Sequence, residues 1–299
     1  MNSWYKDFSE YMGEIFPGVK VQKLSIDAGF TCPNRDGSIG TGGCIYCNNA
    51  SFTPSYCHPG DSIETQIEKG KAFFGRKYPE MKYLAYFQSY TNTFGKDTGS
   101  LLSLYRRAAS VEGVAGIIIG TRPDCLPDSL LSGLADLNRD ITVIVEIGAE
   151  TSSDITLRLI NRNHTWGRVE DAVTRLHAAE IRTGLHLIAG LPGESPEDVL
   201  STVRKACALP IESIKMHQLQ IVKGTPLLHL WEKGEISVWP FSPEEYLELC
   251  VRIVRTVPRH ICIERFLASS PPDMVVMPRW GMKNYQFTNL LHNRLRGMQ

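Results

Sequence analysis

Residues 21–47 read VQKLSIDAGFTCPNRDGSIGTGGCIYC, a short apolar run followed closely by three cysteines. Cys44 and Cys47 have the CxxC spacing that lets two thiolates chelate one metal centre, and Cys32 lies upstream of them. Several glycines between Cys32 and Cys44 let the backbone turn tightly enough for three sulfurs to converge. A thiolate cage of this kind suits an iron–sulfur cluster or zinc.

The two kinds of metal centre make different demands on the protein. Three thiolates on a four-iron cluster leave one iron without a protein ligand, and that iron could bind the amino and carboxylate groups of a substrate. A structural zinc site needs four ligands, and Cys57-His58 could supply the fourth. The cysteine pattern alone leaves both centres open, and its position after the first strand of a repeating β/α pattern favours the cluster.

Short apolar segments alternate with helical patterns through most of the chain. Strands are predicted at 21–27, 82–87, 114–120, 141–148, 183–190 and 212–221. Helices are predicted at 62–77, 98–110, 128–138, 153–161, 167–180 and 196–208. Such alternation is typical of a parallel sheet, and six units are too few for a closed eight-stranded barrel. We therefore expect an α/β fold with a partial, TIM-like (β/α)6 barrel, and a doubly wound open sheet is the alternative.

Polar residues capable of chemistry follow each predicted strand. They are Cys32, Gln88–Thr91, Thr121–Asp124, Glu146–Glu150, Gly190–Glu194 and His217. In α/β barrels and open sheets, ligands bind at the carboxyl ends of the strands. The six segments are therefore predicted to converge on one pocket.

The alternation stops near Pro226, which divides the chain into two predicted parts. Residues 1–225 form the predicted core, and residues 226–299 form an α-rich C-terminal extension packed on it. Ser242 is the expected N-cap of a helix near 243–257. The stretch 265–299 is rich in Pro, Trp and Met and shows no clear periodicity.

Composition narrows the class of protein. Hydrophobic residues make up 42% and charged residues 21%, which is enough apolar material for a large core and argues against disorder. A formal net charge of +0 argues against bulk attraction to nucleic acid without excluding a local basic face. With no membrane-length apolar run and no signal-peptide pattern at the start, we expect a cytoplasmic protein with no membrane partner, whose cysteines stay reduced.

Several motifs together resemble one branch of a known family. The segment Leu24–Phe52, with GFTCPNRDGSIGTGGCIYCNNASF, is similar to the YhcC/YtqA-like branch of the radical SAM proteins, a relative of the Elongator catalytic subunit. The similarity continues through Tyr86–Phe94, Gly120–Cys125, Val145–Gly148, Ile160–Arg162, His186–Glu194 and Ile221–Thr225.

The resemblance implies a partial (β/α)6 barrel and a 4Fe–4S cluster held by Cys32, Cys44 and Cys47. It also implies that the cluster cleaves S-adenosylmethionine (SAM) reductively, and that the resulting 5′-deoxyadenosyl radical takes hydrogen from a substrate. A reductant such as flavodoxin or ferredoxin would supply the electron. The other cysteines are then expected to be ordinary thiols, namely Cys57, Cys125, Cys207, Cys250 and Cys262.

The family's SAM contacts carry over to matching positions of this chain. Tyr46 matches an aromatic residue near the adenine, unless it merely covers the cluster. Gln88 and Ser89 match contacts to the methionine part of SAM, and Leu187–Gly190 is expected to line the adenine side, unless its glycine serves only strand-to-helix packing. Glu150 departs from this branch, where Gln usually stands, and so changes the charge expected near SAM.

Other site residues are interpreted from the chemistry of their surroundings. Arg122 could pair a carboxylate with its fork of donors, or Arg122 and Asp124 could form a loop ion pair. Glu146 lies in an otherwise apolar strand, where a carboxylate is costly unless bonded. Ribose hydroxyls are its favoured partner, and a neighbouring Arg or Lys is the alternative.

No catalytic residue is assigned, and the candidates for facing a substrate are His186, Lys215, His217 and Lys223. Strand alternation places Lys215 and His217 on one side of their strand and Met216 on the other, without saying which side faces the pocket.

The preferred hypothesis is a radical SAM enzyme, and the Elongator kinship suggests a tRNA wobble nucleoside as substrate. Helical arginines could touch phosphates, although a solvated face is the favoured interpretation: Arg158, Arg162, Arg168 and Arg175. A second candidate basic surface comprises Arg252, Arg255, Arg259, Arg265, Arg279, Arg294 and Arg296. The alternatives are a zinc-stabilised binding module and an iron–sulfur redox protein without SAM chemistry.

Overall fold

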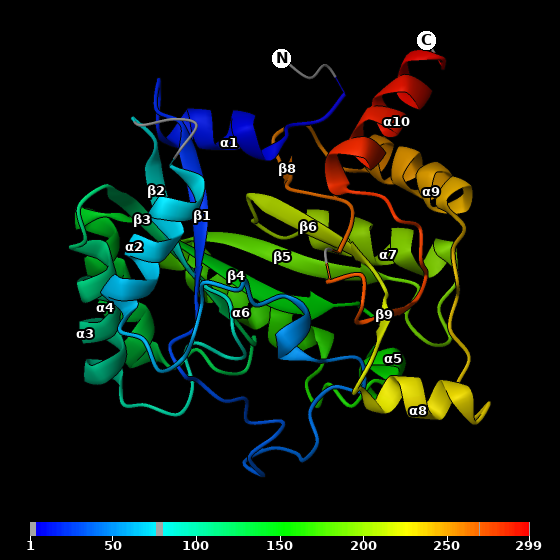
Figure 1. The fold of residues 1–299 in the computed structure, drawn as a ribbon, viewed down its shortest axis with the longest axis horizontal. Helices are drawn as coiled ribbons and strands as arrows, with labels where there is room; N and C mark the ends of the chain where they lie inside the picture. The colour runs from blue at the N-terminus through cyan, green and yellow to red at the C-terminus, as the bar shows by residue number, and fades with distance from the viewer. Residues whose placement is uncertain (1–3, 76–79, 269, 299) are drawn as a thin grey trace.

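Seven parallel strands form one sheet in the computed structural model, which describes residues 4–75, 80–268 and 270–298 (Figure 1). Their order in the sheet follows the chain: β1 (Val21–Ile26), β2 (Lys82–Phe87), β3 (Val114–Thr121), β4 (Thr142–Glu150), β5 (Arg182–Ala189), β6 (Ser213–Gln218) and β8 (Cys262–Ile263). With β1 and β8 at its two edges, the sheet is a partial barrel. The predicted fold class is confirmed, and β8 is a seventh strand supplied by the C-terminal part.

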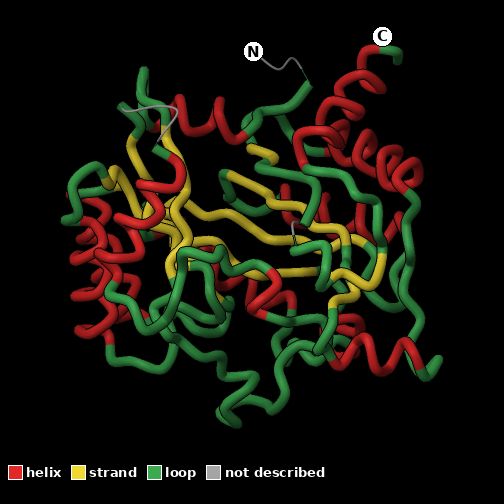
Figure 2. The backbone as a smooth tube through the Cα atoms, viewed as in Figure 1, coloured by secondary structure: helices red, strands yellow, loops and turns green. Residues whose placement is uncertain are grey.

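Helices follow the strands in the predicted alternation (Figure 2). They are α2 (Ile63–Phe74), α3 (Thr98–Ala109), α4 (Asp128–Asp140), α5 (Asp154–Leu159), α6 (Trp166–Ala178) and α7 (Pro196–Cys207). The start of α7 shows why the prediction works: Ser195 and Asp198 form a reciprocal capping box around Pro196 at the first turn. The last two residues of the helix predicted at 62–77 lie outside the described residues.

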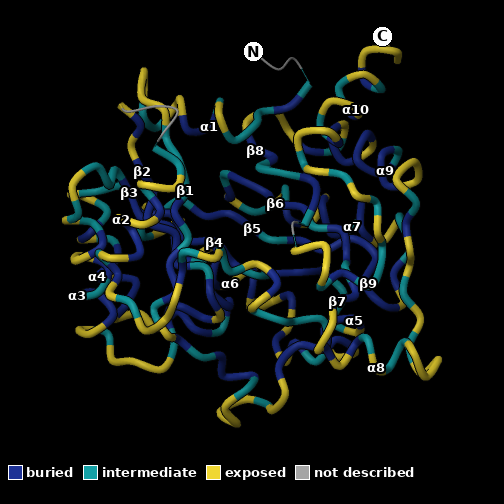
Figure 3. The backbone as a smooth tube through the Cα atoms, viewed as in Figure 1, coloured by how far each residue is buried: buried dark blue, intermediate teal, exposed yellow. Residues whose placement is uncertain are grey.

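Most of the sheet is buried (Figure 3), and its two faces have different surroundings. Alternate residues such as Ile117 and Ile119 of β3 pack against the outer helices, whereas Ile118 faces the concave side. At one end of the concave side, Tyr11 and Met12 of α1 (Phe8–Ile15) close the barrel with apolar contacts. The other end of the concave side is left for polar side chains.

The C-terminal part differs from its prediction in two places. Strand β6 ends at Gln218, and Ile221 and Val222 form a separate strand, β7 (Ile221–Val222), antiparallel to β9 (Val275–Met277). The stretch expected to lack periodicity contains α10 (Asn284–Arg296), which buries Phe287, Leu291 and Leu295 at helical spacing against α9 (Pro243–Thr256). A short helix, α8 (Pro226–Glu232), follows β7, and both are labelled in Figure 3.

Within the described ranges, we find no helix with both the length and the apolar character needed to cross a membrane.

Candidate active site

A cavity of about 780 Å³ lies on the concave face of the sheet. Side chains from β1 to β6, from the cysteine loop and from the segment after β8 line it. All three cysteines of the loop are in its wall, together with Tyr46, Gln88, Arg122, Glu146, Glu150, Lys215 and His217. Five of the six segments predicted to converge therefore do so; the exception is Gly190–Glu194.

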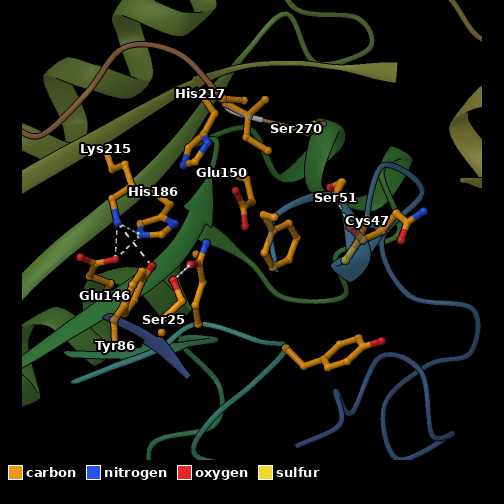
Figure 4. Close-up of a pocket in the computed structure, with 18 of the residues that line it drawn as sticks. Ser25, Cys47, Ser51, Tyr86, Glu146, Glu150, His186, Lys215, His217 and Ser270 are labelled. Atoms are coloured by element: carbon orange, nitrogen blue, oxygen red, sulfur yellow. Dashed lines mark hydrogen bonds and ion pairs between the residues drawn. The ribbon is translucent and has the colours of Figure 1, made fainter. Parts of the chain in front are cut away.

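Figure 4 shows that the cavity has two chemically different ends. Cys47 and Ser51 lie at one end, and Glu146, His186 and Lys215 lie together at the other. We call these the thiol end and the charged end.

Several residues predicted for the SAM site lie away from the cavity wall that the described residues form. Leu187 packs in the core between sheet and helices, because the alternation of β5 turns His186 and Ile188 inward instead. Gly190, at φ +91°, is covered by the extension, since an added Cβ would lie 3.0 Å from the Trp239 carbonyl oxygen. Ser89 is 3% exposed and is buried behind the wall.

Lys223, a candidate for facing the substrate, has an exposed side chain and does not line the cavity of the described residues. Lys215 and His217 do face the cavity, and Met216 packs among the helices. The alternation of β6 thus separates them as predicted and identifies the pocket side.

At the thiol end, hydrogen-bond donors point at a cysteine sulfur. Arg162 Nη1 lies 3.6 Å and Asn34 Nδ2 lies 3.7 Å from Cys44 Sγ. Gly43, at φ +79°, lets the chain pass Arg35, because an added Cβ would lie 2.8 Å from Arg35 Nε. Burial and the neighbouring Cys44 thiolate raise the pKa of Cys47 to about 11.

These contacts fit a thiolate-ligated cluster. Cys32 and Cys44 are buried, and Arg162 brings a positive charge to sulfurs that would ionise as metal ligands. The three cysteines predicted as cluster ligands, Cys32, Cys44 and Cys47, thus line one cavity, and Arg162 and Asn34 donate to the Cys44 sulfur.

Cys57, the candidate fourth zinc ligand, has another partner. Its thiol donates to the backbone oxygen of Ser25 at 2.7 Å, in β1. His58 is exposed. Among the described residues, no group of three or more His, Cys, Asp or Glu side chains is spaced to hold a single metal ion.

Two arginines near the thiol end pair with acids. Arg122 donates to both oxygens of Asp124, at 2.9 and 2.8 Å, so the loop ion pair is what the structure shows. One buried atom, Arg122 Nη1, remains without a protein partner among the described residues.

Arg162 lies 3.3 Å from Glu150 and is only 7% exposed. The expectation that Arg162 belongs to a solvated or phosphate-facing helix surface is therefore wrong.

The charged end is a network around Glu146. Its carboxylate accepts from Lys23 Nζ at 2.7 Å and Lys215 Nζ at 2.5 Å, and it lies 2.7 Å from His186 Nε2. Glu264, after β8, accepts from Lys23 at 2.7 Å. The sequence left ribose hydroxyls or a neighbouring Arg or Lys as partners for Glu146. Within the chain, the structure shows two lysines bonded to it.

The network sets the ionisation of its members. Burial alone would raise the pKa of Glu146, but the Lys215 and Lys23 ammonium groups outweigh it and hold the pKa well below its usual value. Burial lowers the pKa of Lys215, against the opposing effect of Glu146 and Glu264. Glu146 is therefore an anion that holds two lysines in place.

Sequence reasoning missed several residues of this end, namely Lys23, Tyr86, Glu264 and Arg265 as pocket residues. Glu264-Arg265 follows the apolar Ile261-Cys262-Ile263, the same pattern of an apolar run followed by polar residues that marked the other strands. That signal was available, although a two-residue strand is too short to predict with the others.

Two histidines with lowered pKa values, His164 and His217, predict loss of stability in acid. Burial and the Arg162 guanidinium lower the pKa of His164 to about 3, and burial and Arg265 hold the pKa of His217 well below its usual value. Unfolded histidines bind a proton below about pH 6.5, whereas these two stay neutral when folded. The free energy of unfolding should therefore fall by about 1.4 kcal/mol per histidine between pH 7.5 and 5.5.

Thermal unfolding at the two pH values tests this, with His164→Gln as the comparison. The variant should lose about half of the pH-dependent destabilisation assigned to the pair. Identical pH dependence in the variant and the unsubstituted protein would contradict the assignment to His164.

A partial parallel barrel with polar residues and a large cavity on its concave face has the architecture of an α/β-barrel enzyme. Family models identify which one. The model described as the radical SAM superfamily matches residues 35–206, and the model described as the Radical_SAM C-terminal domain matches residues 211–297. The chain belongs to the radical SAM superfamily.

Similar curated proteins span nearly the whole chain. YtqA of Bacillus subtilis, an uncharacterized protein, is 32% identical over 97% of this chain and 89% of its own length. Protein YhcC of Escherichia coli is 36% identical over 88% of this chain and 83% of its own length. These relatives confirm the branch that the sequence motifs suggested.

More distant similarities concern proteins of greater length. A tRNA uridine(34) acetyltransferase of Dehalococcoides mccartyi is 27% identical over 77% of this chain and 56% of its own length. The solved structure of Elp3 from Methanocaldococcus infernus superposes with a TM-score of 0.69 at 16% identity, over 94% of this chain and 63% of that one. The structural likeness concerns the fold alone.

Proposed function

We propose that this radical SAM protein holds a 4Fe–4S cluster on Cys32, Cys44 and Cys47, cleaves SAM reductively, and modifies a nucleoside of tRNA. The observation that carries the first two parts is the thiol end of the cavity, where three cysteines from one glycine-rich loop line the wall and Arg162 donates to Cys44.

The proposed SAM site includes further residues of the cavity wall. Tyr46, Gln88, Arg122 and Glu150 line the cavity, and Arg122 Nη1 is a buried donor without a protein partner among the described residues. An unsatisfied buried donor is costly, and a carboxylate is a suitable acceptor for it. When bound, the cluster and SAM supply the chemistry of hydrogen-atom abstraction.

The protein's own residues would balance the charge of the thiolates and limit the access of water to the reacting groups. Arg162 offsets thiolate charge and is itself fixed by the Gly148 carbonyl at 2.6 Å and by Glu150 at 3.3 Å. The apolar and aromatic part of the wall, including Tyr46 and Ile188, limits the water that a reactive intermediate could meet.

The tRNA part of the proposal rests on relatives. The Dehalococcoides mccartyi protein is named as acting on tRNA uridine 34, and the chain shares the barrel of Elp3. The candidate basic surfaces give less support, because several of their arginines form ion pairs with carboxylates: Arg175, Arg252, Arg259 and Arg294. In the cell, a flavodoxin or ferredoxin is the proposed electron donor.

Anaerobic reconstitution followed by a SAM-cleavage assay, with and without total tRNA, tests the proposal. We expect 5′-deoxyadenosine to form under a strong reductant and to form faster with tRNA. Cleavage that tRNA does not change would contradict the substrate, and a cluster without any cleavage would indicate an iron–sulfur redox protein. One zinc per chain would indicate the zinc-stabilised binding module instead.

A further inference from the structure

We propose that His217 and Arg265 form an oxyanion subsite, which holds a carboxylate or phosphate group of the substrate. This inference deepens the proposed function, because it rests on the cavity being the place where the substrate binds. Both residues line the cavity, His217 from β6 and Arg265 from the segment after β8.

The hydrogen bond between the two residues determines where the histidine carries its proton. Arg265 Nη2 lies 3.2 Å from His217 Nδ1. A guanidinium group can only donate, so Nδ1 accepts, and the neutral ring must carry its hydrogen on Nε2. The lowered pKa of His217, which burial and Arg265 cause, agrees with a neutral ring.

Two buried donors are then left without acceptors. Neither His217 Nε2 nor Arg265 Nε has a hydrogen-bond partner among the described residues, and both atoms are inaccessible to solvent. Leaving a buried donor unsatisfied costs about 1–3 kcal/mol. Two such atoms in one hydrogen-bonded pair of the cavity wall call for an acceptor from outside the chain.

The charge balance of this end favours an anionic acceptor. The positive charges of Lys23 and Lys215 are balanced by the negative charges of Glu146 and Glu264. Each ammonium group lies no more than 3.4 Å from both carboxylates. Arg265 adds a third positive charge, and no described carboxylate lies within 4.0 Å of its guanidinium group. An oxyanion would neutralise this charge and supply acceptor oxygens for the free donors, as guanidinium groups bind carboxylate and phosphate.

The subsite is well placed for a substrate rather than for SAM. Figure 4 shows His217 and Ser270 apart from Cys47, with Glu150 between them and the thiol end. A substrate anchored by its anion at His217 would extend toward the thiol end. The atom that loses hydrogen is therefore expected to lie some distance along the substrate from its anionic group.

The test titrates the reconstituted protein with two small probes. Inorganic phosphate is followed by phosphorus NMR line broadening, and trifluoroacetate, a carboxylate, by fluorine NMR. We expect saturable broadening that Arg265→Gln weakens at least tenfold and Arg265→Lys weakens less, because lysine keeps the charge without the fork of donors. His217→Gln should bind better than His217→Leu, since only glutamine can donate.

The control is Arg107→Gln, which removes a surface guanidinium paired with Glu64. It should leave probe binding unchanged, and circular dichroism shows whether each variant is folded. The tighter probe identifies the group as phosphate or carboxylate. Equal probe binding by folded Arg265→Gln and the unsubstituted protein, or no saturable binding at all, would overturn the subsite. Cluster content and SAM cleavage are measured separately, so this failure is distinguishable from failure of the proposed function.

Discussion

Cys44→Ala is expected to remove the cluster and abolish SAM cleavage. The thiol of Cys44 lies in the cavity wall and receives hydrogen bonds from both Arg162 and Asn34, so the fold fixes the position of this sulfur. Loss of a residue that only supports a metal ligand costs about 10–100-fold in affinity or activity. Loss of a ligand itself should exceed about 100-fold in 5′-deoxyadenosine release, measured after anaerobic reconstitution.

A matched cysteine substitution separates this result from a general effect on folding. Cys57→Ala removes a thiol that is also buried but bonds to the Ser25 carbonyl oxygen. It should keep both iron and cleavage activity. If Cys57→Ala lost the metal as completely as Cys44→Ala, the zinc site with Cys57 as fourth ligand would be supported instead.

Among the substitutions described, Glu146→Gln is expected to lower the free energy of unfolding the most. Glu146 is 2% exposed, and its carboxylate offsets the charges of Lys23 and Lys215. Removing one partner of a buried ion pair typically costs about 3–5 kcal/mol, because the remaining charges are left uncompensated. In a protein of this size the midpoint of thermal unfolding should fall by roughly 5–15 °C.

The same substitution at an exposed position serves as the control. Glu235 lies 3.9 Å from Lys233 with both side chains more than half exposed, so Glu235→Gln should change stability by less than about 0.5 kcal/mol. Equal melting temperatures for the two variants would contradict a stabilising role for the ion pairs of Glu146.

Calorimetry of SAM binding tests the ribose contact predicted from the sequence. If Glu146 binds the ribose hydroxyls, the Glu146→Gln variant should bind SAM more weakly than the unsubstituted protein.

Much of the fold could be predicted because its signals are local. The central strands of the parallel sheet are largely buried on both faces, so runs such as Ile117-Ile118-Ile119 stand out from their surroundings. Helix starts such as Ser195-Pro196 are equally local. Helix α10 was missed although Phe287, Leu291 and Leu295 recur at helical spacing, because exposed residues such as Leu290 blur the apolar face.

The candidate site could be predicted only where one segment carries the chemistry. The three cysteines lie in one loop, so their spacing indicates a metal centre. The partners of Glu146 are distant in the chain, as Lys23 and Lys215 join it only when β1, β4 and β6 form one sheet. A single sequence therefore shows that Glu146 needs a partner without showing which one. The same limit applies to the bond between Arg265 and His217, which joins the C-terminal part to β6.

Metal and sulfide analysis of protein purified without oxygen, combined with electron paramagnetic resonance of the reduced sample, tests the central claim most directly. We predict about four iron and four sulfide per chain, and a spectrum that changes when SAM is added, because one iron lacks a protein ligand. A single zinc ion, or a cluster whose spectrum is the same with and without SAM, would contradict the account.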